Sequence, residues 1–113
     1  MNLSEFKRIM NGIKDTRKVS FTKHAEERLV QRNINKDEIL KSLYELKDLV
    51  SVEVRGSDED LFGQEYTLRF KKLSNYDLVV VITIKAEKVE VVTAYYPDKK
   101  KEKRYKEWRD SQK

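Results

Sequence analysis

The sequence predicts an α+β domain in which N-terminal helices pack on one face of a four-stranded antiparallel sheet, followed by a C-terminal helix. Two patterns predict this class. Apolar residues recur at helical spacing up to about residue 46, and from Leu49 onward they recur at every second position. The 113 residues are enough for one domain and too few for two, so a single domain over residues 1–113 is expected.

Helical periodicity predicts two helices in the first 32 residues. The first covers residues 2–12, and Gly12 is expected to end it. Its apolar face consists of Leu3, Phe6, Ile9 and Met10. The second covers about residues 23–32, behind the N-cap residue Thr22. Residues Lys18–Phe21 are expected to form a short extended piece between the two.

A third helix follows a break at Asn33–Asn35. Asn35 is the expected N-cap, and Glu38 stands where a carboxylate completes a capping box. The apolar face of this helix consists of Ile39, Leu40, Leu43 and Leu46. All three helices therefore have one face suited to packing on the sheet.

Alternating apolar residues predict the sheet. The four expected strands are Leu49–Arg55, Tyr66–Lys71, Leu78–Ile84 and Val89–Tyr96. In the first strand, Val50, Val52 and Val54 are expected to face the core. The third strand is apolar on both faces and is the expected central strand, and Pro97 ends the last one.

Composition narrows the classes of function. The chain has no cysteine, which excludes disulfides, thiolate nucleophiles and Cys-based zinc sites and agrees with a cytoplasmic location. No apolar run approaches the ~20 residues that span a bilayer, so no membrane contact is expected. The net charge of +5 favours an anionic partner such as nucleic acid. The acidic run Asp58–Asp60 is interpreted as a solvated loop, and neither a metal nor a cofactor is expected.

The second helix carries the most informative residues of the chain. His24, Arg28 and Arg32 are spaced by four and therefore lie above one another on one side of the helix. Ala25 and Leu29 on the adjacent stripe are expected to bury against the sheet. His24 also lies in the first helical turn, where free N–H groups favour anions. A phosphate bound there would meet an imidazole, a guanidinium group and backbone donors together.

This combination fits the cleavage of RNA. Breaking a phosphodiester without a metal requires a base for the 2′-OH, an acid for the leaving oxygen and cations for the developing charge. His24 can serve as the base or the acid, and Arg28 and Arg32 as the cations. The same spacing also fits an ordinary charged helix surface, in which the arginines pair with Glu26, Glu27 or Glu38.

The stretch FTKHAEERLVQRNINKDEIL resembles the H-A-x-x-R-x-x-x-R-x-I-x-x-x-x-I signature of a small uncharacterised bacterial and archaeal family. That family is grouped with RelE/ParE-like toxins and with the wider barnase–EndoU–colicin–RelE ribonuclease superfamily. The matching residues are His24, Ala25, Arg28, Arg32, Ile34 and Ile39. The later segment Val91–Pro97 is similar to the family's closing strand. The resemblance implies a RelE-like fold, and it leaves activity open because the wider group includes ribosome-dependent mRNA interferases, gyrase inhibitors and inactive members.

Two strands contribute further candidates. Tyr95 is assigned to the catalytic set because a tyrosine can stack on a base or assist proton transfer, and Thr93 on the same face can hydrogen-bond a phosphate. Since adjacent strand residues point to opposite faces, only one of Tyr95 and Tyr96 is expected to line a cleft while the other packs in the core. Arg69 and Lys71 are expected to decorate the sheet surface, either as an RNA platform or as plain solvated charges.

The C-terminal residues 98–113 contain eight Lys/Arg and four Asp/Glu, so their net charge of +4 accounts for most of the total. They are expected to form a basic helix with an aromatic edge at Tyr105 and Trp108. The proposed RNA contacts in this segment are Lys99, Lys100, Lys101, Lys103 and Arg104, with Lys23 added from the second helix. The alternative is a helix anchored by its aromatic residues, with the charges solvated.

Together, these features lead to a metal-independent endoribonuclease of toxin type as the working hypothesis. Its expected partners are RNA, including ribosome-bound mRNA, and an antitoxin protein. The alternatives are a non-catalytic nucleic-acid-binding module, or a ParE-like protein-interaction domain or inhibitor. The chain has only one histidine, so a His–His pair is excluded and the second catalytic group is unassigned.

Overall fold

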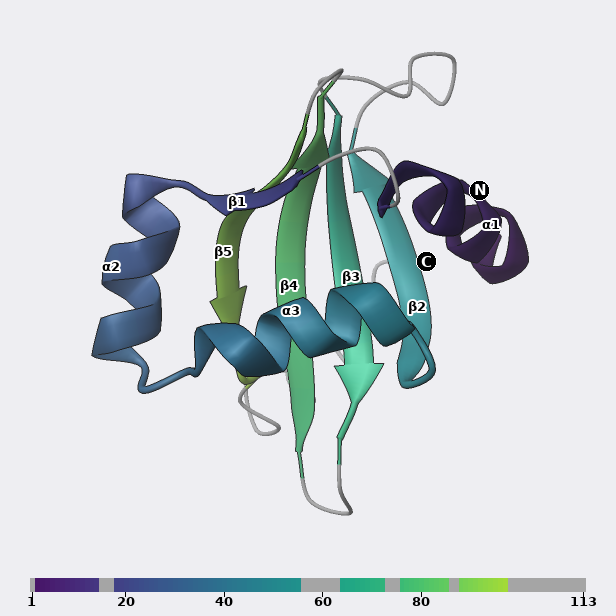
Figure 1. Cartoon of the computed structure of the whole chain (residues 1–113). Helices are drawn as coiled ribbons and strands as arrows, with labels where there is room; N and C mark the ends of the chain where they lie inside the picture. Colours follow the sequence, from purple (N-terminus) through teal and green to yellow (C-terminus); the bar gives the residue numbers. More distant parts are fainter. Residues whose placement is uncertain (1, 15–17, 56–63, 73–75, 86–87, 98–113) are drawn as a thin grey trace, which may run out of the picture.

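The computed structural model describes residues 2–14, 18–55, 64–72, 76–85 and 88–97 (Figure 1). The helices are α1 (Leu3–Lys14), α2 (Lys23–Gln31) and α3 (Lys36–Glu45). The strands are β1 (Lys18–Phe21), β2 (Leu49–Arg55), β3 (Glu65–Lys71), β4 (Asp77–Ile84) and β5 (Lys88–Tyr95). The α+β class is confirmed, and the expected C-terminal helix lies outside the described residues.

The sheet has five strands in the order β1-β5-β4-β3-β2. Strands β2 to β5 form the predicted antiparallel meander, with β4 at the centre. The prediction of a four-stranded, purely antiparallel sheet is wrong, because the short piece β1 pairs in parallel with β5. Four residues are too few for apolar alternation to reveal this pairing. Parallel strands need a longer connection than a hairpin, and here the connection includes α2 and α3.

The helices lie on and around one face of the sheet (Figure 1). In this view α3 crosses the front of the sheet, α1 lies beside β2, and α2 lies beside β5. The side chains that α1 and α3 bury include Phe6, Met10, Ile39 and Leu43. They pack against the inward residues of the strands, which are Leu49, Tyr66, Leu68, Phe70, Leu78, Val80, Ile82, Ile84, Val89, Val91 and Ala94. The opposite face of the sheet is free of α1 and α3.

Both predicted N-caps of α2 and α3 are confirmed. The Thr22 hydroxyl accepts a hydrogen bond from the backbone N–H of Ala25, and the Asn35 side chain accepts one from the N–H of Asp37. The predicted capping box is wrong, because the Glu38 carboxylate accepts hydrogen bonds from tyrosines instead. Gly12 does not end α1, which continues to Lys14.

The first strand of the meander departs from simple alternation at Val50. The register with β3 shifts between Leu49 and Ser51, which marks an irregularity of the β-bulge type. Leu49 is therefore buried, and Val50, which alternation places in the core, is half exposed. Val52 and Val54 keep their contact with the core. In the described part of the chain, no helix is long and apolar enough to cross a membrane.

Candidate functional site

The α2 helix presents the predicted stripe of His24, Arg28 and Arg32 beside β5. Ala25 and Leu29 are buried, as expected, and hold the helix against the strand. His24 is exposed and Arg28 is partly buried. The polar stripe therefore follows the rim of the core, and its last residue, Arg32, reaches β5.

His24 and Arg28 are in direct contact. Arg28 Nε donates to His24 Nε2 at 3.4 Å, and Arg28 Nη1 donates to Gln31 Oε1 at 3.0 Å. In this contact the lone pair of His24 Nε2 accepts the Arg28 N–H. For His24 to act as a general base, this nitrogen has to exchange the Arg28 N–H for a substrate proton.

Arg32 extends the stripe onto β5. Its Nη1 donates to the Ala94 carbonyl oxygen at 2.8 Å and to Thr93 Oγ1 at 3.2 Å. The guanidinium carbon lies 5.9 Å from the centre of the Tyr95 ring. These contacts join the end of α2 to the end of β5.

The short length of β1 explains why Arg32 occupies this place. Strand β1 pairs only with Lys88–Val91, so within the described residues the second half of β5 has no neighbouring strand on that side. Thr22 N–H donates to Val91 O at 3.0 Å, and Arg32 donates to Ala94 O further along the strand. The Arg32 side chain thus supplies a hydrogen bond that a longer β1 would supply. No other described residue is hydrogen-bonded to the Arg32 guanidinium group than Thr93 and Ala94.

Tyr95 and Tyr96 diverge at the end of β5. Tyr95 lies on the sheet face opposite α3, in the register row Arg69–Val79–Tyr95. Tyr96 turns toward α3, where it contacts Glu38. The expectation that one of them packs in the core is wrong, because their exposed fractions are 37% and 38% and Ala94 takes the buried position.

We call His24, Arg28, Arg32, Thr93 and Tyr95 the α2–β5 surface. All five were predicted from the sequence, and the structure brings Arg32, Thr93 and Tyr95 into contact. The alternative was that the arginines pair with nearby glutamates. Two of those glutamates, Glu26 and Glu38, have other partners instead. Glu26 pairs with Lys36 at 2.6 Å, and Glu38 binds tyrosines.

The predicted RNA-contacting residues are distributed unevenly. Lys23 is exposed at the start of α2, next to His24. Arg69 lies two strands away from Tyr95 on the same sheet face and forms an ion pair with Asp77 at 2.7 Å. Lys71 is exposed at the end of β3. The proposed contacts of the tail, Lys99, Lys100, Lys101, Lys103 and Arg104, lie outside the described residues, as does Asp58–Asp60.

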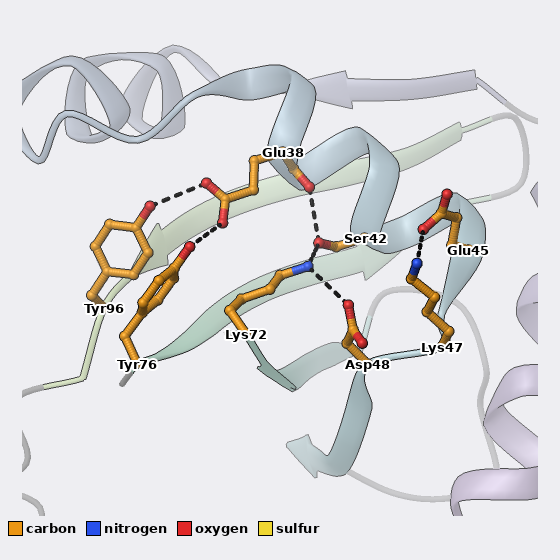
Figure 2. A network of polar contacts seen from close by, with 8 residues as sticks. All are labelled: Glu38, Ser42, Glu45, Lys47, Asp48, Lys72, Tyr76 and Tyr96. Atoms are coloured by element: carbon orange, nitrogen blue, oxygen red, sulfur yellow. Dashed lines mark hydrogen bonds and ion pairs between the residues drawn. The ribbon is translucent and has the colours of Figure 1, made fainter. Parts of the chain in front are cut away.

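A second polar group, which we call the Glu38 cluster, consists of Glu38, Tyr76 and Tyr96 (Figure 2). Tyr76 and Tyr96 donate to the two different carboxylate oxygens of Glu38, at 3.4 and 3.2 Å. Their rings meet edge to face with centroids 5.2 Å apart. Burial and the negative charge of Glu38 raise the pKa of Tyr96 to about 12 and also raise the pKa of Tyr76. Both hydroxyl groups therefore remain protonated donors at neutral pH.

A third group, the Lys72 network, consists of Ser42, Asp48 and Lys72 (Figure 2). Lys72 Nζ donates to Ser42 Oγ and lies 3.5 Å from an Asp48 carboxylate oxygen, and the Ser42 hydroxyl donates to Glu38 O at 2.9 Å. The Lys72 side chain is only 14% exposed. Sequence reasoning missed this network; the one available signal was Ser42, a polar residue beside the apolar stripe of α3.

Among the described residues, no group of three or more histidine, aspartate or glutamate side chains is arranged to hold a metal ion. A shallow depression between α2 and α3 is lined by Glu26, Leu29, Val30, Asn33, Ile34 and Lys36. No predicted site residue lines it.

The chain matches a protein-family model described as a domain of unknown function, DUF4258, over residues 21–96. The match covers about two thirds of the chain, so the chain belongs to this family. It includes α2, α3 and all strands from β2 to β5, and therefore the α2–β5 surface, the Glu38 cluster and the Lys72 network. Comparisons with curated proteins and with solved structures gave no match.

Proposed function

We propose that the protein is a RelE-like, metal-independent endoribonuclease of toxin type that acts on RNA at the α2–β5 surface. The observation that carries this proposal is the contact between His24 Nε2 and Arg28 Nε, in line with Arg32 at the end of β5. It combines an imidazole with two guanidinium groups on one accessible stripe. The basic net charge of the chain agrees with a polyanionic substrate.

The proposed reaction proceeds by transesterification. His24 Nε2 exchanges the N–H of Arg28 for a ribose 2′-OH and accepts its proton, and the 2′-oxygen attacks the adjacent phosphorus. The bond from phosphorus to the 5′-oxygen breaks, which leaves a 2′,3′-cyclic phosphate on one fragment. The 5′-oxygen takes a proton, for which the Tyr95 hydroxyl is the candidate donor. Arg28 and Arg32 stabilise the charge that develops on the phosphate oxygens.

A toxin of this kind would be restrained in the cytoplasm by an antitoxin protein. Its RNA substrate would be free RNA or mRNA held on the ribosome. The chemistry is the same in both cases, and an assay with and without ribosomes separates them.

The test is cleavage of end-labelled RNA by the purified chain in the presence of EDTA. We expect His24→Ala and Arg28→Ala to reduce cleavage at least ~100-fold, as befits loss of a general base or a charge-stabilising group. Arg8→Ala, which removes an exposed arginine from α1, is the control and should cleave normally. RNA that stays intact with and without ribosomes would overturn the enzymatic proposal.

A non-catalytic nucleic-acid-binding module is the second candidate. The observation that favours it is that, in the described part of the chain, His24 hydrogen-bonds only to Arg28 and no second proton-transfer group touches it. This candidate predicts RNA binding that weakens as salt rises. It also predicts that His24→Ala leaves the affinity almost unchanged.

A further inference from the structure

We infer that the Glu38 cluster is a binding site for a guanine base of single-stranded RNA. This inference rests on the proposed function, since it assigns a base preference to the same RNA-binding protein. The cluster lies beside the α2–β5 surface along the chain, because Tyr96 directly follows Tyr95 at the end of β5. The two surfaces thus share one strand end.

The acceptor geometry of Glu38 is the first argument. A carboxylate has about four lone-pair positions on its two oxygens. One tyrosine hydroxyl occupies a position on each oxygen. In the described part of the chain, Glu38 forms no ion pair that would use the others. About two acceptor positions therefore remain, one on each of the two neighbouring oxygens.

The pattern of base edges is the second argument. Single-stranded RNA is read through the Watson–Crick edges of splayed bases. Guanine presents two adjacent N–H donors on this edge, N1–H and the N2 amino group. Adenine and cytosine present one amino donor beside an acceptor, and uracil presents a single N–H between two acceptors. A carboxylate with two adjacent free acceptor positions therefore matches guanine alone among the four.

The tyrosine rings supply the third argument. Tyr76 and Tyr96 are 41% and 38% exposed, so their rings leave aromatic surface uncovered beside the carboxylate. Stacking of a base on an aromatic side chain contributes substantially to single-strand binding. The raised pKa of Tyr96 agrees with a hydroxyl that keeps donating to Glu38 and fixes its orientation.

The RNA is proposed to pass the end of β5, where Tyr95 and Tyr96 point to opposite sides. Arg32 lies beside the end of β5, bound to the Ala94 carbonyl oxygen and near the Tyr95 ring. In the proposed path, a phosphate at Arg32 has one neighbouring nucleotide at Tyr95 and the other at the Glu38 cluster. A splayed single strand suits this arrangement, and a duplex does not.

An arginine side chain of a protein partner also presents two parallel N–H donors to a carboxylate. The charge of the chain favours RNA, because a protein with net charge +5 repels a basic partner and attracts a polyanion. Binding of an arginine-rich peptide is therefore an outcome of the test, not part of the proposal.

The experiment measures binding of labelled single-stranded RNA ten nucleotides long, made non-cleavable by 2′-O-methylation, to the full chain. Four oligonucleotides carry guanine, inosine, adenine or cytosine at one central position in a uridine background. We expect the guanine oligonucleotide to bind about tenfold more tightly than the adenine and cytosine ones. Inosine, which keeps N1–H and lacks the N2 amino group, should fall between them.

Glu38→Gln replaces one carboxylate acceptor with an amide donor and should remove the preference for guanine. Glu45→Gln makes the same change on the same helix, away from the tyrosines, and should keep it. If a thermal melt shows that Glu38→Gln does not fold, the comparison of guanine with inosine and adenine on the unaltered chain decides the question. A guanine preference that survives in folded Glu38→Gln would overturn the inference.

The remaining outcomes separate this inference from the proposed function. Tight RNA binding without any base preference would overturn the guanine site and leave RNA binding intact. Failure to bind any of the oligonucleotides would overturn both. Glu38-dependent binding of an arginine-rich peptide, without a guanine preference, would assign the cluster to a protein partner instead.

Discussion

The α2–β5 surface and the Lys72 network both place a cationic side chain between a helix and the sheet, but in different surroundings. Arg32 is exposed, and in the described part of the chain both of its hydrogen bonds use Nη1. Lys72 is 14% exposed and lies between a serine hydroxyl and a carboxylate. An exposed cation can bind an anion, whereas a cation enclosed between a hydroxyl group and a carboxylate stabilises the fold.

The largest expected effect concerns the enclosed cation. Lys72→Ala should lower the free energy of unfolding by about 2 kcal/mol, because it leaves the buried Ser42 hydroxyl and Asp48 without their partner. Urea denaturation measures this change. Lys71→Ala, which removes the neighbouring exposed lysine, should change stability by less than ~0.5 kcal/mol. Equal effects of the two substitutions would contradict the distinction between the regions.

A smaller loss is expected at Arg32. Arg32→Ala should lower the free energy of unfolding by about 1 kcal/mol, because the Ala94 carbonyl oxygen loses its hydrogen bond but can still be reached by water. Arg28→Ala breaks only side-chain contacts with His24 and Gln31 and should stay within ~0.5 kcal/mol of the parent. The same urea series compares them, and the contrast disappears if Arg28→Ala is the more destabilising.

Alkaline titration tests whether Glu38 raises the pKa of Tyr96 in the Glu38 cluster. Absorbance of tyrosinate should show Tyr96 ionising near pH 12, well after an ordinary tyrosine. Because its pKa is raised in the folded chain, this group contributes stability below pH ~10. That contribution is lost as pH rises from the unfolded pKa through the folded one. Glu38→Gln should bring the ionisation to lower pH, and an unchanged titration would count against the carboxylate as a cause.

The smallest effect is expected at Glu90, which forms ion pairs with two lysines and serves as a reference. Hydrogen bonds from Lys88 and Lys85, both at 3.1 Å, hold its pKa below the usual value. These ion pairs therefore stabilise the fold at pH values above the pKa of Glu90 in the unfolded chain. This contribution is lost as pH falls through the pKa of Glu90 in the folded chain. Glu90→Gln should cost about 0.5 kcal/mol at pH 7 in low salt and less in high salt. A cost independent of salt would argue against an electrostatic origin.

Local patterns in the sequence were enough to predict most of the elements. Thr22 and Asn35 cap their helices because a cap depends on neighbours within three residues. The apolar run Leu78–Ile84 predicts the central strand because burial on both faces leaves no polar alternation. The prediction that Val50 faces the core is wrong because a bulge shifts the register by one residue. Alternation in the sequence alone does not reveal this shift.

Partners far apart in the sequence were not predictable in the same way. The stripe of His24, Arg28 and Arg32 follows from helical spacing, but its contact with Ala94 depends on where β1 stops pairing with β5. Glu38 was assigned to a capping box, which is the nearest local partner. Tyr76 and Tyr96 donate to Glu38 instead, because the ends of β4 and β5 lie beside α3 in the folded chain.

The central proposal is that His24 of the α2–β5 surface takes part in chemistry and contributes little to stability. The most direct measurement pairs RNA cleavage in EDTA with urea denaturation for His24→Ala, whose side chain is exposed. We predict that cleavage falls at least ~100-fold while the free energy of unfolding changes by less than ~0.5 kcal/mol. Cleavage equal to that of the parent chain, in a variant that is equally stable, would contradict the claim.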